Sequence, residues 1–368
     1  MHIGIDVSRL AVGQRTGTEH YTWEILQALG QVDRDNHYTL YANHRPAALP
    51  PLPPRFQLRT MPWPRLWTHV RLSAEMLYRA PDVLFVPAHV LPLVHPRRSV
   101  VTIHDLGYMH YPTAHPAAQR LYLRYSTWWS AQFATHLLAD SEATKRDLLH
   151  FCHSQPDKVS VVYLGVSPRF MPVVDAKHLS TVTAKYGVVS PYLLYVGTIQ
   201  PRKNLVRLID ACAMAHLDGV QLVLAGKRGW LTQEIEARAS SLGITHQVHF
   251  TGYVADDDLP ALISGARGFL LPSLYEGFGL PALEAMACGT PVLASVVSSL
   301  PEVIGDAGIL VDPLDVAALA RGLDSLVHDD DLHAVLRARG LTRVAPWSWQ
   351  RCAKQTLSIL EMVAATTA

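Results

Sequence analysis

The chain has few cysteines, no long apolar run and no excess of basic charge. Its 368 residues include four cysteines, and none of them forms a C-x-x-C pair, so a zinc site of that kind is not expected. No stretch reaches the roughly 18 apolar residues that would span a membrane. Lys and Arg number 32 against 31 Asp and Glu, and this balance argues against a nucleic-acid-binding protein, which usually carries a basic excess.

The marks of a secreted protein and of a dehydrogenase are missing as well. The opening MHIGIDVSRL has no basic start, and Asp6 interrupts its apolar run, so it does not resemble a signal peptide. The cysteines stand in apolar or helical contexts typical of reduced thiols, and we expect a cytoplasmic protein. No G-x-G-x-x-G motif follows a predicted strand, which argues against an NAD-type dehydrogenase on a similar fold.

The chain does contain an alternation of short apolar strands and helices, and this alternation occurs twice. In the first half, we expect strands at 2–8, 37–43, 81–87, 99–105, 136–141 and 158–166, and a helix at 117–134. In the second half, strands at 192–198, 220–226, 247–254, 267–273 and 290–295 alternate with helices at 204–215, 231–242, 258–264 and 281–288. This pattern is typical of parallel sheets with helices on both faces.

The sequence therefore predicts an α/β protein of two doubly wound, Rossmann-like domains. We place them at 1–170 and 190–345, with a linker at roughly 167–190 and a last helix that begins near 346. Ligands of open parallel sheets bind at the carboxyl ends of the strands. We expect the two domains to face a cleft and the chemistry to lie at strand ends beside it.

The segment YEGFGLPALEAMACGTPV, 275–292, carries two carboxylates at such a place. Glu276 lies in the loop after a predicted strand, and Glu284 is placed in the first turn of the next helix. Pro281 suits the first turn of that helix, and Gly289 suits its end. Glu284 can accept hydrogen bonds from a ribose diol, or it can simply complement the helix dipole.

The start of the same helix is suited to an anion, because its amide groups and its dipole attract negative charge. Gly277 and Gly279 allow the backbone to approach that anion closely. The loop therefore predicts a sugar nucleotide whose diphosphate lies on it.

A basic pair stands at another strand end, in GTIQPRKNL, 197–205. Arg202 offers a planar fork and Lys203 a point charge, and both can neutralise a departing diphosphate. The alternative is a solvated pair at the start of a helix. Because the acidic loop is expected at the same sheet edge, we favour a functional pair.

Two further segments allow more than one interpretation. The run DDD at 256–258 can hold Mg²⁺ or Mn²⁺ in another class of transferase, but it opens a predicted helix, where acidic residues are favoured, and we expect capping and no metal site. Aromatic and basic residues alternate in 61–72 and 119–129. These segments either pack in the core or face a membrane surface or a lipid-linked acceptor.

The motif E-G-F-G-L-P-x-x-E-A-M-A-x-G-x-P-V, 276–292, resembles the signature of the retaining glycosyltransferases of family 4, which have the GT-B fold. Further features of that family recur in order: T-I-H-D, A-D-S-E, G-T-x-x-P-R-K-N, L-A-G, F-T-G-Y-V and S-S-L-P-E-V. The resemblance implies that the helix in 346–368 packs back on the N-terminal domain. It also implies a metal-independent hexosyltransferase, without a cofactor, that uses a nucleotide-diphosphate sugar and a glycan or lipid-linked acceptor.

The resemblance also implies roles for individual residues. Glu284 would bind the donor ribose, Glu276 and His104 would contact the transferred sugar, and Arg202 and Lys203 would balance the diphosphate. Many relatives have an arginine where this chain has Thr198. It therefore stays open whether Arg202 and Lys203 take over the role of that arginine one for one. His104 is alternatively a structural histidine. The remaining donor-binding residues that we expect are Gly17 by the leaving phosphate, Gly226 and Lys227 in the nucleotide pocket, the backbone of Tyr253 and Val254 at the base, and the loop of Gly277, Phe278, Gly279, Leu280 and Pro281 at the phosphates.

The donor is the least determined part of this interpretation. The G-T-x-x-P-R-K-N variant resembles bacterial mannosyltransferases of surface-polysaccharide assembly, so GDP-mannose is favoured. UDP-glucose, UDP-galactose and N-acetylhexosamine donors stay open, as does a non-catalytic sugar-nucleotide-binding protein. Peripheral contact with the cytoplasmic face of a membrane also stays open, because segments 61–72 and 119–129 suit either a core or a membrane surface.

Overall fold

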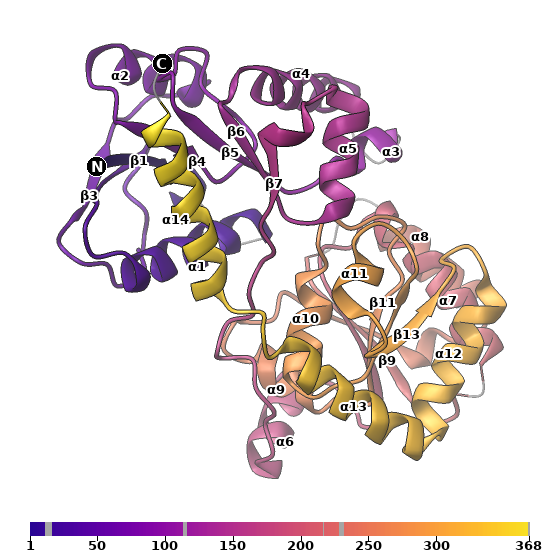
Figure 1. Ribbon diagram of the computed structural model, residues 1–368. Coiled ribbons are helices and arrows are strands. Elements are labelled where there is room, and N and C mark those ends of the chain that lie inside the picture. The colour runs from indigo at the N-terminus through magenta and orange to yellow at the C-terminus, as the bar shows by residue number, and fades with distance from the viewer. Residues whose placement is uncertain (12–16, 113–115, 216, 228–231, 367–368) are drawn as a thin grey trace. The chain divides into compact units, whose positions relative to one another are not determined.

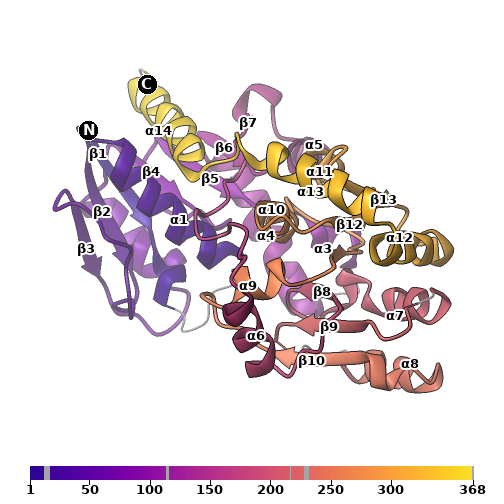
Figure 2. The same ribbon diagram turned by 90° about the horizontal axis from the view of Figure 1, so that it is seen from below.

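The computed structural model describes residues 1–11, 17–112, 116–215, 217–227 and 232–366. The chain divides into two units, Met1–Gly165 with Trp347–Ala368, and Val166–Pro346. Each unit is a parallel sheet with helices packed against it (Figures 1 and 2). The predicted class of two doubly wound α/β domains is confirmed.

In the first unit, the described residues form a seven-stranded sheet of order β3-β2-β1-β4-β5-β6-β7, and every neighbouring pair is parallel. The order reverses direction at β1 and β4, the kind of position where such sheets bind ligands. The strands are β1 (His2–Asp6), β2 (His37–Ala42), β3 (Phe56–Thr60), β4 (Val83–Val86), β5 (Ser99–Ile103), β6 (His136–Ala139) and β7 (Val159–Val161).

The helices of this unit cover both faces of the sheet. On one face, Leu84, Val101 and Leu137 of neighbouring strands share a core with the segment Met61–Met76 and with helices α4 and α5. Because side chains alternate along a strand, the intervening residues are buried against the other face. The helical elements are η1 (Ser8–Ala11), α1 (Gly17–Val32), the π-helical η2 (Thr68–Leu72), α2 (Ser73–Tyr78), α3 (Gly107–His110), α4 (Ala117–Phe133), α5 (Glu142–Cys152), η4 (Pro156–Lys158) and α14 (Trp349–Ala365).

Helix α14 comes from the far end of the chain and yet belongs to the first unit. It packs on α1, β4 and β5, and Ser348 caps it by accepting a hydrogen bond from the Arg351 amide at 3.2 Å. Gly165 lies directly against its start, because a Cβ at that position would be 2.1 Å from the Trp349 nitrogen. The expectation that the last helix packs on the N-terminal domain is confirmed.

In the second unit, the described residues form a six-stranded sheet of order β10-β9-β8-β11-β12-β13, again parallel throughout. The strands are β8 (Tyr192–Val196), β9 (Gln221–Ala225), β10 (Val248–Gly252), β11 (Gly268–Leu271), β12 (Val292–Ser295) and β13 (Gly308–Val311). The helical elements are α6 (Ala176–Lys185), η5 (Pro201–Lys203), α7 (Leu205–Met214), α8 (Thr232–Ser241), η6 (Thr245–Gln247), α9 (Leu259–Ser264), α10 (Leu280–Ala287), α11 (Leu300–Ile304), α12 (Val316–His328) and α13 (Asp330–Val344).

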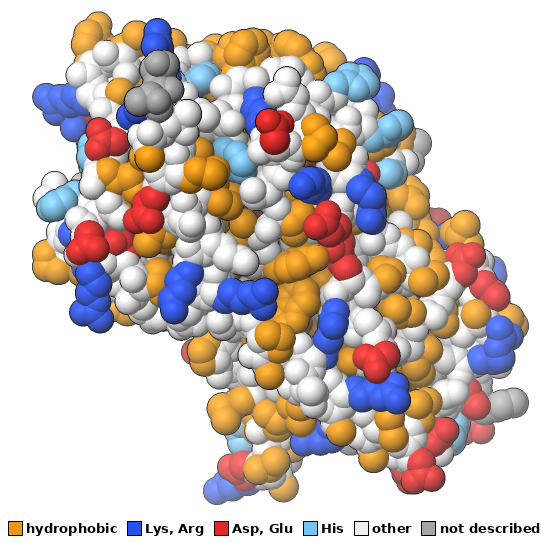
Figure 3. Space-filling view, in the orientation of Figure 1, with side chains coloured by type: hydrophobic (Ala, Val, Ile, Leu, Met, Phe, Trp, Pro, Cys, Tyr) orange, Lys and Arg blue, Asp and Glu red, His pale blue; other side chains and the backbone are white. Residues whose placement is uncertain are grey.

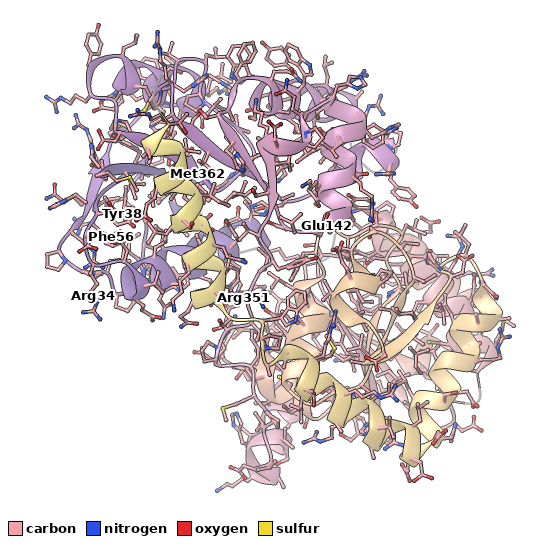
Figure 4. The ribbon with its side chains drawn as sticks, viewed as in Figure 1. Arg34, Tyr38, Phe56, Glu142, Arg351 and Met362 are labelled. Atoms are coloured by element: carbon pink, nitrogen blue, oxygen red, sulfur yellow. The ribbon has the colours of Figure 1, made fainter. Side chains whose placement is uncertain are left out.

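Two edge strands, β3 and β13, were not predicted from the sequence. β3 is joined to the sheet partly by the ring of Phe56, which stacks on Tyr38 of β2 with ring centroids 4.0 Å apart (Figure 4). An edge strand is covered less completely than a central one, and the residues of both strands are mostly half-exposed. β3, with the sequence FQLRT, therefore lacks the apolar run that marks the central strands, whereas β13, with the sequence GILV, is apolar and was missed although its composition suits a strand.

The predicted linker at 167–190 was wrong in part, because it contains helix α6 and lies in the second unit. Asp175 starts the helix by accepting a hydrogen bond from the Lys177 amide at 3.0 Å. Its single fully buried residue is Val182, so the segment shows little of the apolar periodicity by which helices are recognised.

Candidate active site

The loop after β11 places Glu276 against the turn after β8, the neighbouring strand in the sheet. The Lys203 ammonium donates to Glu276 Oε1 at 2.5 Å, and the Arg202 guanidinium lies 3.7 Å from Oε2. The Ser273 hydroxyl donates to Oε1 at 2.6 Å. Arg202, Lys203 and Glu276 thus form one charged cluster at a sheet edge, although Lys203 and Glu276 are 73 positions apart in the sequence.

Arg202 also ties the two loops together through their backbones. Its guanidinium donates to the Tyr275 carbonyl at 2.7 Å, and its own carbonyl accepts from the Leu274 amide at 2.8 Å. Asn204, which follows the basic pair in the left-handed conformation at φ +59°, is buried and donates to the Pro313 carbonyl at 2.8 Å. The basic turn is therefore held rigidly and is not a solvated pair at a helix start.

The charge state of Glu276 follows from this surrounding. Burial acts to raise the pKa of its carboxyl, but the charges of Lys203 and Arg202, with hydrogen bonds from Lys203 and Ser273, hold the pKa below its ordinary value. The side chain is 9% exposed, so a carboxylate and two cations share a nearly dry place. Such an ionised group is suited to accept hydrogen bonds from sugar hydroxyls and to face developing positive charge.

The loop from Glu276 to helix α10 is pinned by two neighbouring serines. Ser298 accepts a hydrogen bond from the Glu276 amide at 2.9 Å. Ser299 donates to the carbonyls of Glu276 and Phe278, at 2.9 and 2.8 Å. Both serines belong to the S-S-L-P-E-V motif, and their role was not predicted, because nothing in the sequence indicates which loop they face.

Helix α10 begins after Gly279, which stands at φ +102°, a conformation that favours glycine. Gly289 follows its end at φ +73°, as predicted. Pro281 has no N–H, and the Ala282 amide donates to the Gly279 carbonyl at 3.0 Å. Pro281, which was expected at the phosphates with the rest of its loop, therefore cannot donate a backbone hydrogen bond to them.

The position of Glu284 was also predicted incorrectly. Helix α10 runs from Leu280 to Ala287, so Glu284 is its fifth residue and lies in the second turn. The predicted helix began too late, because Leu280 before the proline was assigned to the loop. The Glu284 side chain is half-buried.

The strand ends of β8, β9 and β10 meet at three glycines. Gly197, Gly226 and Gly252 have φ values of +153°, +148° and +72°. The Gly226 amide donates to the Gly252 carbonyl at 2.8 Å, and a Cβ on Gly226 would lie 2.0 Å from the Gly197 carbonyl oxygen. These strand ends carry no side chains at the three glycines, and their backbones pack closely together. Their peptide groups are therefore uncovered at the place where a nucleotide was expected.

The other expected donor residues surround these glycines with varying exposure. Lys227 is half-buried, and its carbonyl accepts from the Ile199 amide at 3.1 Å. Thr198 is exposed, and its carbonyl accepts from the Tyr195 hydroxyl at 3.2 Å. Tyr253 is exposed, whereas the side chains of Val254 and Phe278 are buried, so these two could meet a ligand only through their backbones.

His104 lies in the first unit, at the end of β5, and both of its ring nitrogens are engaged. Nδ1 is 2.7 Å from the Asp140 carboxylate, and Nε2 is 2.8 Å from the Pro87 carbonyl. Since both partners are acceptors, the ring donates twice. With both ring nitrogens engaged in this way, no ring N–H of His104 is free for a sugar hydroxyl, and a contact of His104 with the transferred sugar stays a prediction.

The charge of His104 is consistent with that geometry. Burial acts to lower the pKa of the ring, but the charge and hydrogen bond of Asp140, with the hydrogen bond to the Pro87 carbonyl, raise the pKa above its ordinary value. The neighbouring His89 is neutral, because burial, with the charge of His104, lowers its pKa to about 3. Its Nε2 accepts from the His104 amide at 3.3 Å.

The A-D-S-E motif, residues 139–142, therefore orients the ring of His104. Asp140 holds the ring, and the Ser141 hydroxyl caps helix α5 by accepting from the Thr144 amide at 3.0 Å. Asp140 was not among the predicted site residues. Its place directly after β6, the strand beside β5, was the signal that could have indicated it.

The remaining expectations concern the first helix and the acidic run. Gly17 begins α1, where a Cβ would meet nothing within 4 Å, so the fold does not require a glycine there. Asp258 stands before α9 but does not cap it with its side chain. The capping prediction was wrong there, because the carboxylate instead accepts from Lys185 and Tyr186, each at 2.6 Å.

Within the described ranges, no group of three or more His, Cys, Asp or Glu side chains is placed to hold a metal ion. Across the same residues, no helix combines the length and the apolar character needed to cross a bilayer.

The fold and these strand-end clusters are those expected of a glycosyltransferase, and comparison with known proteins agrees. The model of Glycosyltransferase Family 4 matches residues 15–170, and that of glycosyl transferases group 1 matches residues 187–343. O-antigen chain mannosyltransferase B of Escherichia coli is 36% identical over 274 residues, which are 72% of this chain and 71% of that protein. The chain belongs to the family 4 glycosyltransferases, and the resemblance seen in its motifs is confirmed.

Two further comparisons show how far the likeness extends. A serotype-specific mannosyltransferase of Escherichia coli is 35% identical over 229 residues, which are 60% of this chain and 28% of that longer protein. The structure of sucrose-phosphate synthase from Thermosynechococcus elongatus superposes with a TM-score of 0.79 at 22% identity and covers the whole of both chains. This likeness confirms the predicted GT-B fold.

Proposed function

We propose that this glycosyltransferase moves mannose from GDP-mannose to a glycan or lipid-linked acceptor with retention of anomeric configuration, in the synthesis of a bacterial surface polysaccharide. The mannosyl assignment is supported by two relatives named as mannosyltransferases, one of them of the O-antigen chain, and by the G-T-x-x-P-R-K-N segment at 197–204. The second unit would bind the donor and the first unit the acceptor, at the cytoplasmic face of the membrane.

The observation that carries the proposal is the cluster of Lys203, Arg202 and Glu276. In a nearly buried site before the start of α10, the carboxylate of Glu276 lies 2.5 Å from the Lys203 ammonium and 3.7 Å from the Arg202 guanidinium. A diphosphate needs cations and amide donors, whereas a sugar ring needs a hydroxyl acceptor. This cluster supplies both at one strand-end edge.

The chemistry assigned to these residues has one bond made and one broken. The acceptor oxygen bonds to the anomeric carbon on the face from which the diphosphate departs, and the acceptor proton passes to the leaving phosphate oxygen. Lys203 and Arg202 would stabilise the diphosphate as its charge grows, and Glu276 would hold the sugar hydroxyls. Since two side-chain cations stand where the leaving group is expected, we propose that neither a metal ion nor a separate cofactor is required.

Two alternatives remain distinguishable by experiment. A UDP-linked glucose, galactose or N-acetylhexosamine would use the same charged cluster and differ only at the base and the sugar. A non-catalytic sugar-nucleotide-binding protein would bind the donor without releasing the nucleoside diphosphate. Release of GDP or UDP by the purified chain is measured with and without acceptor glycan. Acceptor-dependent release indicates a transferase, and the nucleotide released identifies its donor, whereas no release indicates a non-catalytic binding protein.

The first test is a thermal-shift panel with GDP, UDP, ADP, their mannose and glucose conjugates and NAD, each in the presence of EDTA. A ligand that binds only the folded state raises the melting temperature. We expect a shift with GDP and GDP-mannose that EDTA leaves intact. A shift with UDP compounds alone would show that the donor is a UDP-linked sugar and not GDP-mannose. A shift with NAD alone would overturn the assignment as a transferase.

A second prediction concerns the ribose contact of Glu284. Glu284→Ala should weaken GDP and GDP-mannose equally, by about 10- to 100-fold, because both ligands carry the ribose and a hydrogen bond to a charged group is lost. Isothermal titration measures both affinities. The matched control is Glu234→Ala, an exposed glutamate in the first turn of α8, which should leave both affinities unchanged. If only the affinity for GDP-mannose falls, the contact assigned to Glu284 would be with the mannose and not with the ribose.

A further inference from the structure

Helix α4 carries most of its large apolar side chains on the outside, whereas Leu123 and Trp129 are half-buried and Trp129 packs on the core. Its fully buried residues are Ser126, Thr127, Ser130 and Ala131, all small. Its exposed ones include Leu121 at 70%, Tyr122, Tyr125 at 51%, Trp128 at 44% and Phe133. A surface helix of a globular protein normally shows the opposite arrangement, so the outer face of α4 is built for contact with something other than water.

Hydrogen bonds hold the helix in this orientation. The Ser130 hydroxyl donates to the His89 carbonyl at 2.6 Å and accepts from the Leu91 amide at 2.9 Å. Lys158 donates to the carbonyls of Ala131 and Gln132 at the end of the helix, at 2.9 and 2.7 Å. Turning the helix to bury its aromatic side would break these contacts and leave buried polar groups without partners.

The exposed side chains form one connected surface. The rings of Tyr125 and Trp128 lie 6.2 Å apart, and the rings of Trp128 and Phe133 are equally close. The Tyr122 hydroxyl is 3.2 Å from the His69 ring nitrogen, and this contact joins α4 to η2, where Val70 is exposed. Figure 3 shows hydrophobic side chains gathered along the upper edge of the first unit, over α2 and α4. We call Val70, Leu121, Tyr122, Tyr125, Trp128 and Phe133 the outer aromatic surface.

The part of the chain that carries this surface is poor in acidic residues. Residues 36–139 contain ten arginines, no lysine and only three acidic residues, in a chain whose net charge is +1. Of those three, Glu75 is buried and paired with Arg59 and Arg71, and Asp82 and Asp105 accept backbone amide hydrogen bonds. Within 106–139 there is no carboxylate at all, whereas Arg124 is exposed on α4 itself.

We propose that the outer aromatic surface binds the face of a bilayer that contains anionic phospholipid. Tyr and Trp side chains suit the headgroup region because each has an apolar body and a polar end. Arginines without neighbouring acids are attracted to a negative lipid surface. A protein partner would have to be apolar and acidic over the same area, whereas an anionic bilayer has both properties everywhere. This inference deepens the membrane location proposed above, and it depends on the identity of neither the donor nor the acceptor.

Sedimentation of the full chain with lipid vesicles tests the proposal. We expect binding to vesicles of phosphatidylcholine with phosphatidylglycerol, weak binding to phosphatidylcholine alone, and loss of binding at high salt. Tyr125→Ser with Trp128→Ser should weaken the partition by roughly tenfold or more, and Arg124→Gln by about fivefold. Leu121→Ser serves as a second apolar variant. Melting curves should match those of the wild type, because these side chains are exposed.

Matched controls come from the second unit. Met214→Ser with Leu314→Ser removes apolar side chains that are 58% and 60% exposed, and Arg321→Gln removes an exposed arginine. Both should bind vesicles as the wild type does. Failure of the wild type to bind anionic vesicles, or unchanged binding of both apolar variants on α4, would overturn the proposal. A dimer in sedimentation velocity that the α4 variants dissociate, without vesicle binding, would assign the surface to a second copy of the chain.

Discussion

Replacing Lys203 by alanine is expected to lower turnover by about 100- to 1,000-fold, the usual effect of removing one preorganised group that stabilises transition-state charge. Lys203 is the cation closest to Glu276, at 2.5 Å. Without it, Arg202 at 3.7 Å is left to balance both the carboxylate and the departing diphosphate. The measurement is the steady-state release of GDP from GDP-mannose with acceptor present.

The same change also destabilises the protein, because it leaves the buried Glu276 carboxylate with one distant cation, at a cost of roughly 3 kcal/mol or more in the free energy of unfolding. A double variant, Lys203→Ala with Glu276→Ala, separates the two effects. It should recover part of the lost stability in urea unfolding without recovering turnover. Recovery of both would mean that Lys203 acts only as a structural partner of Glu276.

The control is Lys185→Ala, which removes a lysine from another ion pair of the same unit. Lys185 donates to Asp258 at 2.6 Å but is 57% exposed, and exposed pairs contribute little to stability. Its loss should leave turnover within the error of the assay. Near-normal turnover of the Lys203 variant would remove that residue from the proposed mechanism.

Gly226→Ala is expected to lower the free energy of unfolding by about 4 kcal/mol or more. The new Cβ would stand 2.0 Å from the Gly197 carbonyl oxygen and 2.7 Å from its carbon. These are backbone atoms, so no side-chain rotation relieves the overlap. The φ of +148° adds strain for any residue with a Cβ. Strands β8 and β9 would have to separate at the end where the donor is expected.

Thermal unfolding of the variant, with the shift caused by GDP, measures both consequences. Gly219→Ala is the matched control, because Gly219 also has a positive φ, +74°, but a Cβ there meets nothing within 4 Å. It should lose only about 1–2 kcal/mol through backbone strain and keep the response to GDP. An equal loss in both variants would show that φ, and not the approach to Gly197, decides the stability at Gly226.

The central strands and the charged cluster were predictable for one reason. Central parallel strands are buried on both faces, so each leaves an apolar run that can be recognised without a partner. Parallel strands also end at one edge, so Lys203 after β8 and Glu276 after β11 were expected near each other. Their direct ion pair was not predicted, because a contact across 73 residues depends on the neighbour order β8-β11.

Local motifs failed where a distant residue competed for the same side chain. Asp258 stands at a helix start, a place that favours capping, but Lys185 and Tyr186 from α6 bind its carboxylate. His104 resembles a free donor at a strand end, but Asp140 and Pro87 occupy both of its nitrogens. In each case the partner lies in another element, so only the folded chain shows the outcome.

By itself the sequence determined the two α/β domains, most strand positions and the family, because burial and turn chemistry leave local patterns in the chain. It did not determine the role of segment 119–129, which fitted a core and a membrane surface equally well. A helical period shows that apolar residues share a side but not which side meets the sheet. The tertiary structure decided which side of the helix meets the sheet, since Ser126 and Ser130 face inward and Tyr125 and Trp128 face outward.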